Sequence, residues 1–395
     1  MSYVLSINFT SKKPDFQNKK LTLAIKKTMM MNQRYYLLLF VMLGTFVACN
    51  PSARKLKTPG PAKNIILLIG DGMGLTQVSS LYYFGDKTPN FSRFKYIGLH
   101  ENQPIGKKIT DSAAGATAFS TGYKSYNGAI GVDKDTVRRE TILEWAAKKQ
   151  KSTGLISTSS ITHATPASFY AHVPSRNLPE AIAADFVNAP VDFAAGGGYQ
   201  FFNKRTDKRD LLAEMQAEGR VVDTTQLGKK LTQGNRYVYL LKPDAMLQIL
   251  DGRGDFLPKA TTTALDFLSK DEDGFFLMVE GSQIDWGGHN NDAKYIIKEM
   301  LDFDKVVGLA LDFAEKDGNT LVIVTADHET GGFALSAAKM FGKDEYGGIE
   351  PTFSTTGHTA ALIPVFAFGP GAERFMGIYQ NNDIFFKMKR SFSLK

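Results

Sequence analysis

The sequence predicts an α/β protein, a three-layer sandwich in which helices cover both faces of a central, mostly parallel β-sheet. Short apolar runs without charge alternate along the chain with longer segments of helical pattern. Continuous apolarity is typical of strands that are buried on both faces, and alternation with helices indicates parallel connections. The runs expected to form buried parallel strands are Ile65–Ile69, Thr153–Ile156, Phe275–Val279, Leu321–Val324 and Leu362–Phe368.

The segments between these runs predict the helices. They are Glu140–Lys148, Pro179–Val187, Lys208–Glu218, Thr261–Ser269 and Lys294–Glu315. Residues 61–395 contain no long linker, repeat or low-complexity block, so we expect a single domain over this range. Within it, the two glycines Gly331-Gly332 precede an expected modest loop around Gly342–Gly348.

Acidic residues follow three of the expected strands. Ile65–Ile69 leads into Asp71, Phe275–Val279 into Glu280 and then Asp285, and Leu321–Val324 into Asp327-His328. Ligands gather at the carboxyl ends of strands in such folds. Four carboxylates at one edge would repel one another unless cations lie between them or protons neutralise them. Carboxylates with neutral imidazoles are the ligands of zinc, and carboxylates are also those of magnesium.

Each of these residues also has a plain structural interpretation. Asp71 in its glycine loop is consistent with a simple turn, Glu280 with an ordinary strand-end acid, and Asp327 with a capping carboxylate. Asp285 and His289 are four residues apart, a spacing that metal sites use but that is also common by chance. His358 alone is no more than a structural histidine. The metal hypothesis therefore depends on the whole set.

Ser112 stands where a short turn opens an alanine-rich helix. The free N–H groups and the dipole at a helix N-terminus favour an anion such as phosphate. The same segment is consistent with Asp111 or Ser112 simply capping the helix. No histidine lies nearby in the sequence to act as a base. An activated Ser112 would need another means, such as a zinc ion on its oxygen.

Taken together, the motifs resemble the alkaline phosphatase family. DSAAGATAFSTGYKSYNGAIG, at Asp111–Gly131, is similar to the family's nucleophile segment. The other similar motifs are NIILLIGDGMG from Asn64, HATPASFYAHVPSR from His163, FFLMVEGSQIDWGGH from Phe275, VTADHETGG from Val324 and GHT from Gly357. The resemblance covers about Asn64 to Phe368, and the combination is highly specific.

The resemblance implies a phosphomonoesterase that forms a phosphoserine at Ser112 and binds two zinc ions and one magnesium ion. Asp285, His289 and His358 would hold the first zinc; Asp71, Ser112, Asp327 and His328 the second; and Asp71, Thr165 and Glu280 the magnesium. Arg176 would clamp two phosphate oxygens, which suits its planar fork. Asp111, His163 and Trp286 are expected beside the metals or the substrate.

Three positions depart from some family members. His163 stands where some have an aspartate that orients a magnesium-bound water, which predicts weaker magnesium binding at the third site or acceptance of zinc there. Thr330 stands where some have a histidine, a position expected to tune activity. Trp286 stands where some have a lysine near the phosphate. The pairing of His163 with Trp286 also occurs in the family.

The excess basic charge belongs to the first fifty residues. The chain holds 47 Lys and Arg against 40 Asp and Glu, and residues 1–50 hold seven of the former and one of the latter. The remainder is nearly neutral, which argues against a surface for nucleic acid. The expected partners are small phosphate monoesters. Relatives are often homodimers, but no sequence feature displays an interface.

The single cysteine, Cys49, excludes an internal disulfide and follows an uncharged apolar run, Tyr35–Ala48. The run is short for a membrane span and fits the core of a secretory signal. Its end resembles a bacterial lipobox, although Phe46 stands where Leu is usual. We expect a signal peptide over 29–49, lipidation of Cys49, a tether over 50–60 and location in the bacterial periplasm or envelope. The alternative is a buried free cysteine in a helix.

Three methionines, Met29 to Met31, shortly precede the apolar run. A secretory signal starts near its chain's N-terminus, so residues 1–28 are expected to be an upstream extension without a structural role.

Two other classes of function stay open. One is a related phosphodiesterase or sulfatase, although the CxPxR-like context of sulfatases is absent around Ser112. The other is a non-catalytic lipoprotein that binds metal or phosphate.

Overall fold

The computed structural model describes residues 60–228, 230–340 and 342–392. Internal contacts divide the chain into Met1–Thr58 and Pro59–Lys395, and the described residues belong to the second unit. The expected extension over 1–28, the signal over 29–49 with Cys49, and the tether up to residue 59 lie outside the described residues and stay predictions. Among the described residues, no helix is both long enough and apolar enough to cross a membrane.

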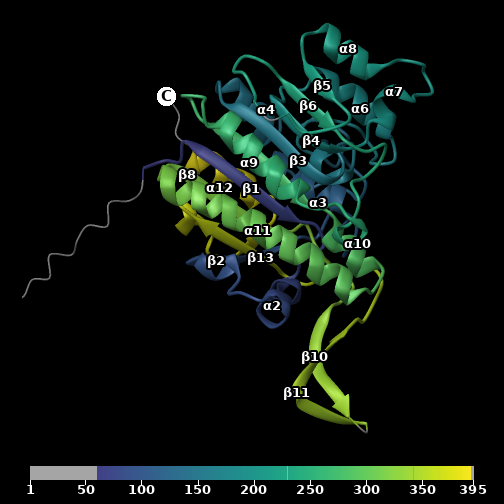
Figure 1. Ribbon diagram of the computed structural model, residues 1–395, viewed down its shortest axis with the longest axis vertical. Coiled ribbons are helices and arrows are strands. Elements are labelled where there is room, and N and C mark those ends of the chain that lie inside the picture. Colours follow the sequence, from purple (N-terminus) through teal and green to yellow (C-terminus); the bar gives the residue numbers. More distant parts are fainter. Residues whose placement is uncertain (1–59, 229, 341, 393–395) are drawn as a thin grey trace, which may run out of the picture. The chain divides into compact units, whose positions relative to one another are not determined.

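Ten strands of the described residues form one sheet (Figure 1). Their spatial order is β14-β2-β13-β8-β1-β7-β3-β4-β6-β5. The bounds are Asn64–Gly70 (β1), Tyr96–Glu101 (β2), Ser152–Ser160 (β3), Phe193–Gly197 (β4), Val221–Asp223 (β5), Tyr237–Leu240 (β6), Phe275–Gly281 (β7), Thr320–Thr325 (β8), Ile363–Phe368 (β13) and Gly377–Gln380 (β14). The predicted α/β class with a mostly parallel sheet is confirmed.

One expected strand runs in the opposite direction from the prediction. β13 pairs antiparallel with both of its neighbours, β8 and β2, whereas β1 pairs parallel with β7 and β8. The prediction of a parallel strand over Leu362–Phe368 was therefore wrong, because an apolar run reports burial but not direction. The reversal has a consequence for the site. The residues that enter β13, rather than those that leave it, lie at the edge where the parallel strands end.

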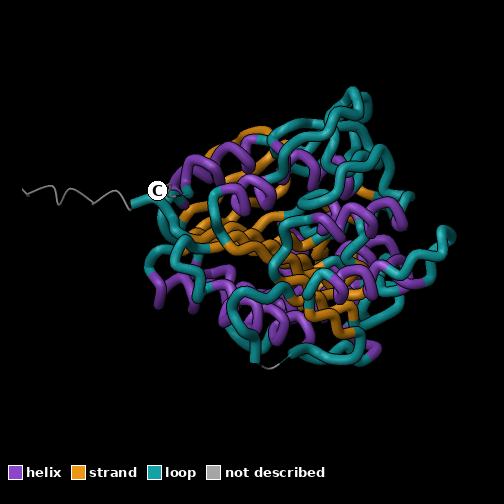
Figure 2. Tube along the Cα trace, turned by 90° about the horizontal axis from the view of Figure 1, so that it is seen from above, coloured by secondary structure: helices purple, strands orange, loops and turns teal. Residues whose placement is uncertain are grey.

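Helices cover both faces of the sheet (Figures 1 and 2). The strand β1 divides its side chains between them: Ile65, Leu67 and Ile69 belong to one apolar cluster, and Ile66 and Leu68 to the other. The first cluster includes side chains of α3 (Ser112–Thr121), α4 (Ile142–Lys148), α5 (Ala164–Ala167), α6 (Pro179–Asn188), α7 (Gln200–Asn203), α8 (Leu211–Ala217) and α12 (Asp383–Ser391); the second includes side chains of α2 (Leu75–Phe84), α9 (Phe256–Leu268), α10 (Gln283–His289) and α11 (Ala293–Asp317). Figure 1 shows α9 and α11 crossing in front of the strands. This alternation places a core on each side of the sheet.

The segment expected as a modest loop is a β-hairpin. β10 (Ala334–Met340) pairs antiparallel with β11 (Lys343–Thr352), and Figure 1 shows the hairpin standing apart from the sheet. Its base is closed by a short ladder in which β9 (Glu329–Thr330) pairs with β12 (His358–Thr359). The prediction was wrong because the strands of a solvated hairpin lack the continuous apolar signal of buried strands.

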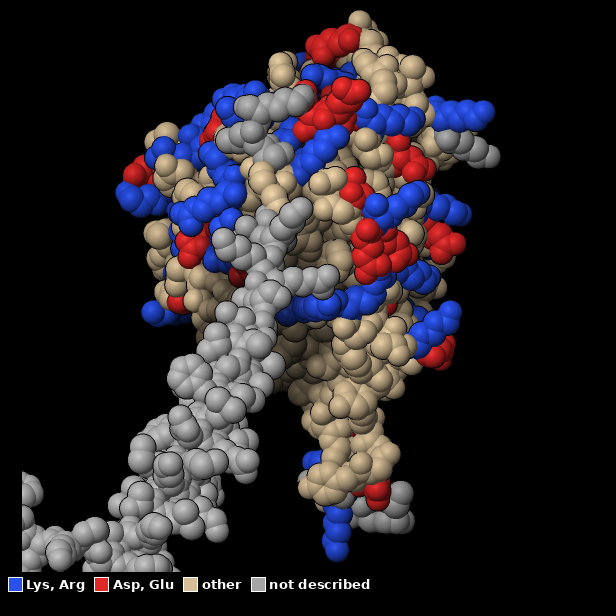
Figure 3. Space-filling view, turned by 90° about the vertical axis from the view of Figure 1, so that its left-hand side faces the viewer, with Lys and Arg blue, Asp and Glu red and all other residues tan. Residues whose placement is uncertain are grey.

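Charges of both signs are mixed on the face that Figure 3 shows. Lys and Arg side chains lie interspersed with Asp and Glu side chains over the described residues. Mixed charges of this kind produce no strong field of one sign over that face.

Candidate metal centre

The parallel strands deliver acidic residues to one edge of the sheet. Asp71 follows β1, whose Ile69 is in register with Glu280 on β7 and with Thr325 on β8. Asp327 lies two residues beyond Thr325. Within the residues that the structure describes, three groups could each hold a metal ion, with ligand atoms within 4.8 Å of one another: Asp285, His289 and His358; Asp71, Asp327 and His328; and Asp71, His163 and Glu280.

The first group joins a helix to the strand β12. Asp285 and His289 lie on α10, and His289 Nε2 is 3.4 Å from Asp285 Oδ2. His358 Nε2 lies 3.6 Å from Asp285 Oδ1 and 3.1 Å from His289 Nε2. Each ring turns its Nδ1 to a backbone carbonyl, His289 to Thr356 at 2.6 Å and His358 to Thr110 at 2.8 Å. Those contacts leave both Nε2 atoms facing the same point, as zinc-bound histidines do.

The second group surrounds the hydroxyl of Ser112. His328 Nε2 lies 3.3 Å from Ser112 Oγ, 3.2 Å from Asp327 Oδ2 and 3.5 Å from Asp71 Oδ1. The side chains of Asp71, Asp327 and His328 are fully buried. A histidine thus lies beside Ser112, although it comes from a position more than two hundred residues away in the chain.

The third group contains His163 as well as the residues expected there. His163 joins Asp71 and Glu280, and burial lowers the pKa of His163 to about 4, with the charge of Arg176 acting in the same direction. The hydroxyl of Thr165 is fully buried. A neutral imidazole is therefore placed where some family members have an aspartate, and the group carries less negative charge.

Burial and mutual repulsion shift the carboxylates. Burial, and then the charges of Asp327, Asp285 and Glu280, hold the pKa of Asp71 well above its usual range. Burial raises the pKa of Glu280 to about 7 and lowers that of His328 to about 4. Without a cation the group is therefore strained electrostatically.

Several buried polar atoms in the three groups have no hydrogen-bond partner among the described residues. They are both carboxylate oxygens of Asp71, Asp327 Oδ2, Glu280 Oε1, Thr165 Oγ1 and His163 Nδ1. Buried polar atoms without partners are costly, so their concentration at one place calls for a ligand. The oxygens are donors that magnesium prefers, and carboxylate with imidazole suits zinc, so the donor atoms of these groups fit metal ions of both kinds.

The helix α3 begins at Ser112 and is capped by its neighbour. Asp111 Oδ1 accepts a hydrogen bond from Ala114 N at 3.0 Å, while its other oxygen lies 3.1 Å from Arg176 Nη1. The capping and functional interpretations of this segment are thus compatible. Gly115 has no side chain, and this allows α3 to lie close to the metal-binding residues. A Cβ at this position would stand only 2.9 Å from Cβ of Asp327.

Arg176, at the far end of the His163 motif, contacts the side chains of Asp111 and His163. Its Nη2 lies 3.3 Å from His163 Nε2, and its side chain is 23% exposed. Trp286 approaches the other side of the imidazole, with the ring centroids of His163 and Trp286 6.2 Å apart in an edge-to-face arrangement. A guanidinium beside a helix N-terminus forms a site for an anion.

Sequence reasoning missed the polar residues that support these groups. Ser157 donates to Glu280 Oε2, and Ser159 and Ser282 extend the hydroxyl cluster. His100 and Asn102 contact the backbone carbonyls of Ala326 and Asp327, respectively, each at 3.0 Å. The run Ser157-Thr158-Ser159-Ser160, buried at the end of an apolar strand, is the signal that could have revealed the first cluster.

Thr330 connects two of the groups. Its hydroxyl donates to Asp285 Oδ1 at 2.5 Å and lies 3.2 Å from His328 Nδ1. The threonine thus contacts one residue of each of the first two groups.

Comparison with known proteins identifies the family. A family model described as alkaline phosphatase matches residues 62–350. Alkaline phosphatase 3 of Bacillus subtilis (strain 168) is 34% identical over 405 residues, covering 82% of this chain and 87% of the relative. The alkaline phosphatase of Escherichia coli (strain K12) is 34% identical over 414 residues, covering 85% of this chain and 87% of the relative.

A solved structure gives the same result at higher similarity. Alkaline phosphatase from the Antarctic bacterium TAB5 superimposes with a TM-score of 0.83 at 51% identity, covering 85% of this chain and 99% of that chain. A mutant of that enzyme, in which a histidine is replaced by aspartate, is described with Mg bound in its M3 site. Because the family model, the curated relatives and the solved structure agree along most of its length, this chain belongs to the alkaline phosphatase family and is a phosphomonoesterase hydrolase.

Proposed function

We propose that the chain hydrolyses phosphate monoesters through a phosphoserine at Ser112, with two zinc ions and one magnesium ion. The observation that carries the proposal is the contact between Ser112 Oγ and His328 Nε2 at 3.3 Å, within a buried group that also contains Asp71 and Asp327. A serine in a merely structural role would not need three buried metal-binding side chains around it. Its place at the start of α3 adds backbone N–H groups that favour phosphate.

The reaction takes place in two displacements. Ser112 Oγ forms a bond to phosphorus as the bond from phosphorus to the leaving oxygen breaks, and the alcohol departs. A water molecule then cleaves the phosphoserine, which releases inorganic phosphate and restores the hydroxyl of Ser112. When bound, the zinc ions supply Lewis-acid charge that favours an ionised serine or water and stabilises the leaving oxygen.

The protein's own residues orient the phosphoryl group. Arg176 presents two guanidinium N–H groups, and Asp111 holds one of its nitrogens at 3.1 Å. A bidentate guanidinium suits two phosphate oxygens and aligns phosphorus in front of Ser112. We propose Asp285, His289 and His358 as ligands of one zinc, Asp71, Ser112, Asp327 and His328 as ligands of the other, and Asp71, Thr165 and Glu280 as ligands of magnesium, with His163 and Trp286 beside them.

Replacement of Ser112 by alanine tests the proposal. We expect Ser112→Ala to lose most hydrolysis of a generic aryl phosphate and all phosphopeptide at that position in mass spectra of acid-quenched protein, while zinc content and melting temperature are retained. Ser79→Ala is the matched control, because Ser79 is an α2 serine whose hydroxyl donates to Leu75 O. Unchanged turnover in Ser112→Ala would refute the nucleophile. A large preference for a diester over the monoester would indicate a related phosphodiesterase instead.

We also propose export to the bacterial envelope with a lipid anchor on Cys49. The support is the uncharged run that ends at the chain's single cysteine. Labelling of the expressed protein with a radioactive fatty acid, with Cys49→Ser as the control, tests this proposal. N-terminal sequencing of the native protein would show whether residues 1–28 are present, which would contradict the proposed start near Met29.

A homodimer is proposed from exposed apolar side chains. Leu75 and Tyr83 on α2 are 56% and 63% exposed, and Ile97 on β2 is 52% exposed. Large exposed apolar side chains mark an interface where they form a contiguous patch. Sedimentation equilibrium of the wild type and of Tyr83→Lys tests this proposal, and a monomeric wild type would contradict it.

A further inference from the structure

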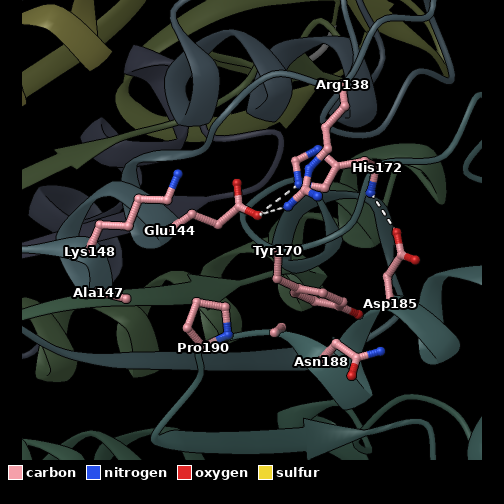
Figure 4. Close-up of a pocket in the computed structure, with 10 residues that line it drawn as sticks. Arg138, Glu144, Ala147, Lys148, Tyr170, His172, Asp185, Asn188 and Pro190 are labelled. Atoms are coloured by element: carbon pink, nitrogen blue, oxygen red, sulfur yellow. Dashed lines mark hydrogen bonds and ion pairs between the residues drawn. The ribbon is translucent and has the colours of Figure 1, made fainter.

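His172 lies at the junction of three segments around the active site. It belongs to the same segment as Thr165 and Arg176, four residues before the latter. Its side chain is 8% exposed, and its ring contacts the backbone of Gly131. On another side the ring lies beside Glu144 of α4 (Figure 4). A buried polar ring is costly unless it is hydrogen-bonded, and both ring nitrogens of His172 have polar partners.

Both ring nitrogens of His172 face hydrogen-bond acceptors. Nδ1 lies 2.8 Å from the carbonyl oxygen of Gly131, and Nε2 lies 3.1 Å from Glu144 Oε1. The ring is therefore held between two hydrogen-bonding partners. The backbone N–H of His172 donates to Asp185 Oδ2 at 2.8 Å. The residue is thus held on three sides.

The acceptor Glu144 is fixed in turn. Its Oε2 accepts from the backbone N–H of Thr141 at 2.9 Å, which completes a capping box at the start of α4. Arg138 contacts Oε1 at 2.5 Å, and Figure 4 shows Arg138 and His172 meeting the same oxygen of Glu144. Burial would raise the pKa of Glu144, but the hydrogen bonds of His172 and Thr141 outweigh it and lower the pKa to about 2. The Glu144 carboxylate is therefore charged, and its hydrogen bonds hold it in place.

A continuous set of backbone contacts leads from His172 to Arg176. Val173 and Ile130 exchange two hydrogen bonds, at 3.0 and 3.1 Å, and Arg176 N donates to the carbonyl of Gly128 at 2.7 Å. The strip 128–131 is itself tied to α3, because Gly131 N donates to the hydroxyl of Thr117 at 3.0 Å. The ring of His172 contacts the end of this strip at Gly131. A Cβ added to Gly131 would lie 2.8 Å from Nδ1 of His172.

We propose that His172 is a positioning residue for phosphate binding: it fixes the strip 128–131 against the segment 172–176 and so aims Arg176 at the phosphate. This inference rests on the proposed clamp function of Arg176. His172 touches neither substrate nor metal ligand and acts only through that arginine. A pocket of about 710 Å³ lies beside the ring and is lined by Arg138, Glu144, Tyr170 and His172 among others, so a shortened side chain would leave a gap that water can enter.

The test compares phosphate binding in His172→Gln and in wild-type enzyme loaded with zinc and magnesium. We expect the inhibition constant of inorganic phosphate and the KM of an aryl phosphate to rise roughly tenfold, the scale of one weakened charged hydrogen bond, with kcat changed much less. A loss of stability alone would lower the active fraction and therefore kcat, and would leave both constants unchanged. His172→Ala is the second variant if His172→Gln does not fold.

Tyr170→Phe is the matched control. Tyr170 lines the same pocket, and its hydroxyl donates to the carbonyl of Ile161 at 2.9 Å, a bond that involves neither Gly131 nor Glu144. We expect Tyr170→Phe to lose a hydrogen bond in the same segment and to keep the phosphate constants of the wild type. Equal increases in Tyr170→Phe and His172→Gln would overturn the specific role of the histidine.

A double-mutant cycle with Arg176→Ala separates the two proposals. If His172 acts through Arg176, His172→Gln weakens phosphate binding in the wild type and has no further effect in Arg176→Ala. Equal effects in both backgrounds, or unchanged constants in His172→Gln, would overturn the positioning role while the clamp stands. If Arg176→Ala itself leaves phosphate binding unchanged, the clamp function fails.

Discussion

Ser157 donates a hydrogen bond to Oε2 of Glu280 at 2.5 Å, while Oε1 of the same carboxylate has no partner among the described residues. The hydroxyl therefore distinguishes two oxygens that are chemically equal. Oε1 is the oxygen left for the group that Glu280 forms with Asp71 and His163.

Ser157→Ala is expected to weaken magnesium binding about tenfold, because the residues behind a metal ligand hold its orientation. Calorimetric titration of the zinc-loaded protein with magnesium measures this directly. The control is Ser160→Ala, since Ser160 lies on the same strand and its hydroxyl contacts Thr162 at 3.0 Å. Equal magnesium affinity in Ser157→Ala and the wild type would contradict the assignment of Oε1.

Glu280→Gln is expected to have opposite effects with and without metal. Burial raises the pKa of Glu280 to about 7 from 4.5, so the metal-free folded state binds a proton more tightly than the unfolded state. That carboxylate therefore destabilises the metal-free protein progressively as the pH rises from 4.5 to about 7.

Over that interval Glu280→Gln should become more stable relative to the wild type in chelator-treated samples. In metal-loaded samples it should be the less stable protein, because a ligand has been removed. Urea unfolding of both forms across the interval gives the comparison. A variant that is less stable than the wild type in both forms at the upper end would count against the raised pKa.

Gly115→Ala sets helix propensity against a close contact. Alanine favours a helix interior over glycine by about 1 kcal/mol, which alone would raise the melting temperature. The added Cβ, however, would stand 2.9 Å from Cβ of Asp327. We expect the contact to displace the carboxylate, so that bound zinc and kcat both fall. Zinc analysis and kinetics check this, and a more stable enzyme with full zinc content would disprove it.

Glu144→Gln is expected to remove part of the acid sensitivity of the fold. The pKa of Glu144 is lowered to about 2 from 4.5, so its stabilising contribution is complete above 4.5 and is lost as the pH falls through about 2. The difference in unfolding free energy between wild type and Glu144→Gln should therefore be widest above pH 4.5 and narrow toward pH 2. Denaturant unfolding of the metal-free proteins measures it. A constant difference over this range would exclude the ionised carboxylate of Glu144 as its source.

Much of the fold could be predicted because burial has a plain signature. Runs such as Ile65–Ile69 are apolar on both faces, and parallel strands necessarily end at a common edge, so the gathering of Asp71, Glu280 and Asp327 follows from strand order alone. Strand direction has no such signature. The apolar run at β13 gave no indication that the strand is reversed, and only that reversal explains how His358, which precedes it, reaches Asp285.

The hydrogen bonds that orient the site residues were harder to predict than the places of those residues in the fold. The hydroxyls of Ser157 and Thr330 orient neighbouring carboxylates through contacts between residues 123 and 45 positions apart, respectively, and no short motif records such a pairing. The hairpin of β10 and β11 escaped prediction for a different reason. Its strands lie largely in solvent, with Tyr346 86% exposed, so their sequence lacks the periodic apolar pattern that burial produces.

The ladder between β9 and β12 makes that hairpin separable from catalysis. Thr330 and His358 are paired directly, so the chain leaves the site and returns to it at the same point. The segment between these two residues starts and ends at this pair, so its length does not alter the distance between them. The hairpin over 334–352, which lies beyond the Thr356 carbonyl that contacts His289, is therefore a natural place to shorten, lengthen or exchange surface structure, as in domain insertion, without altering the site.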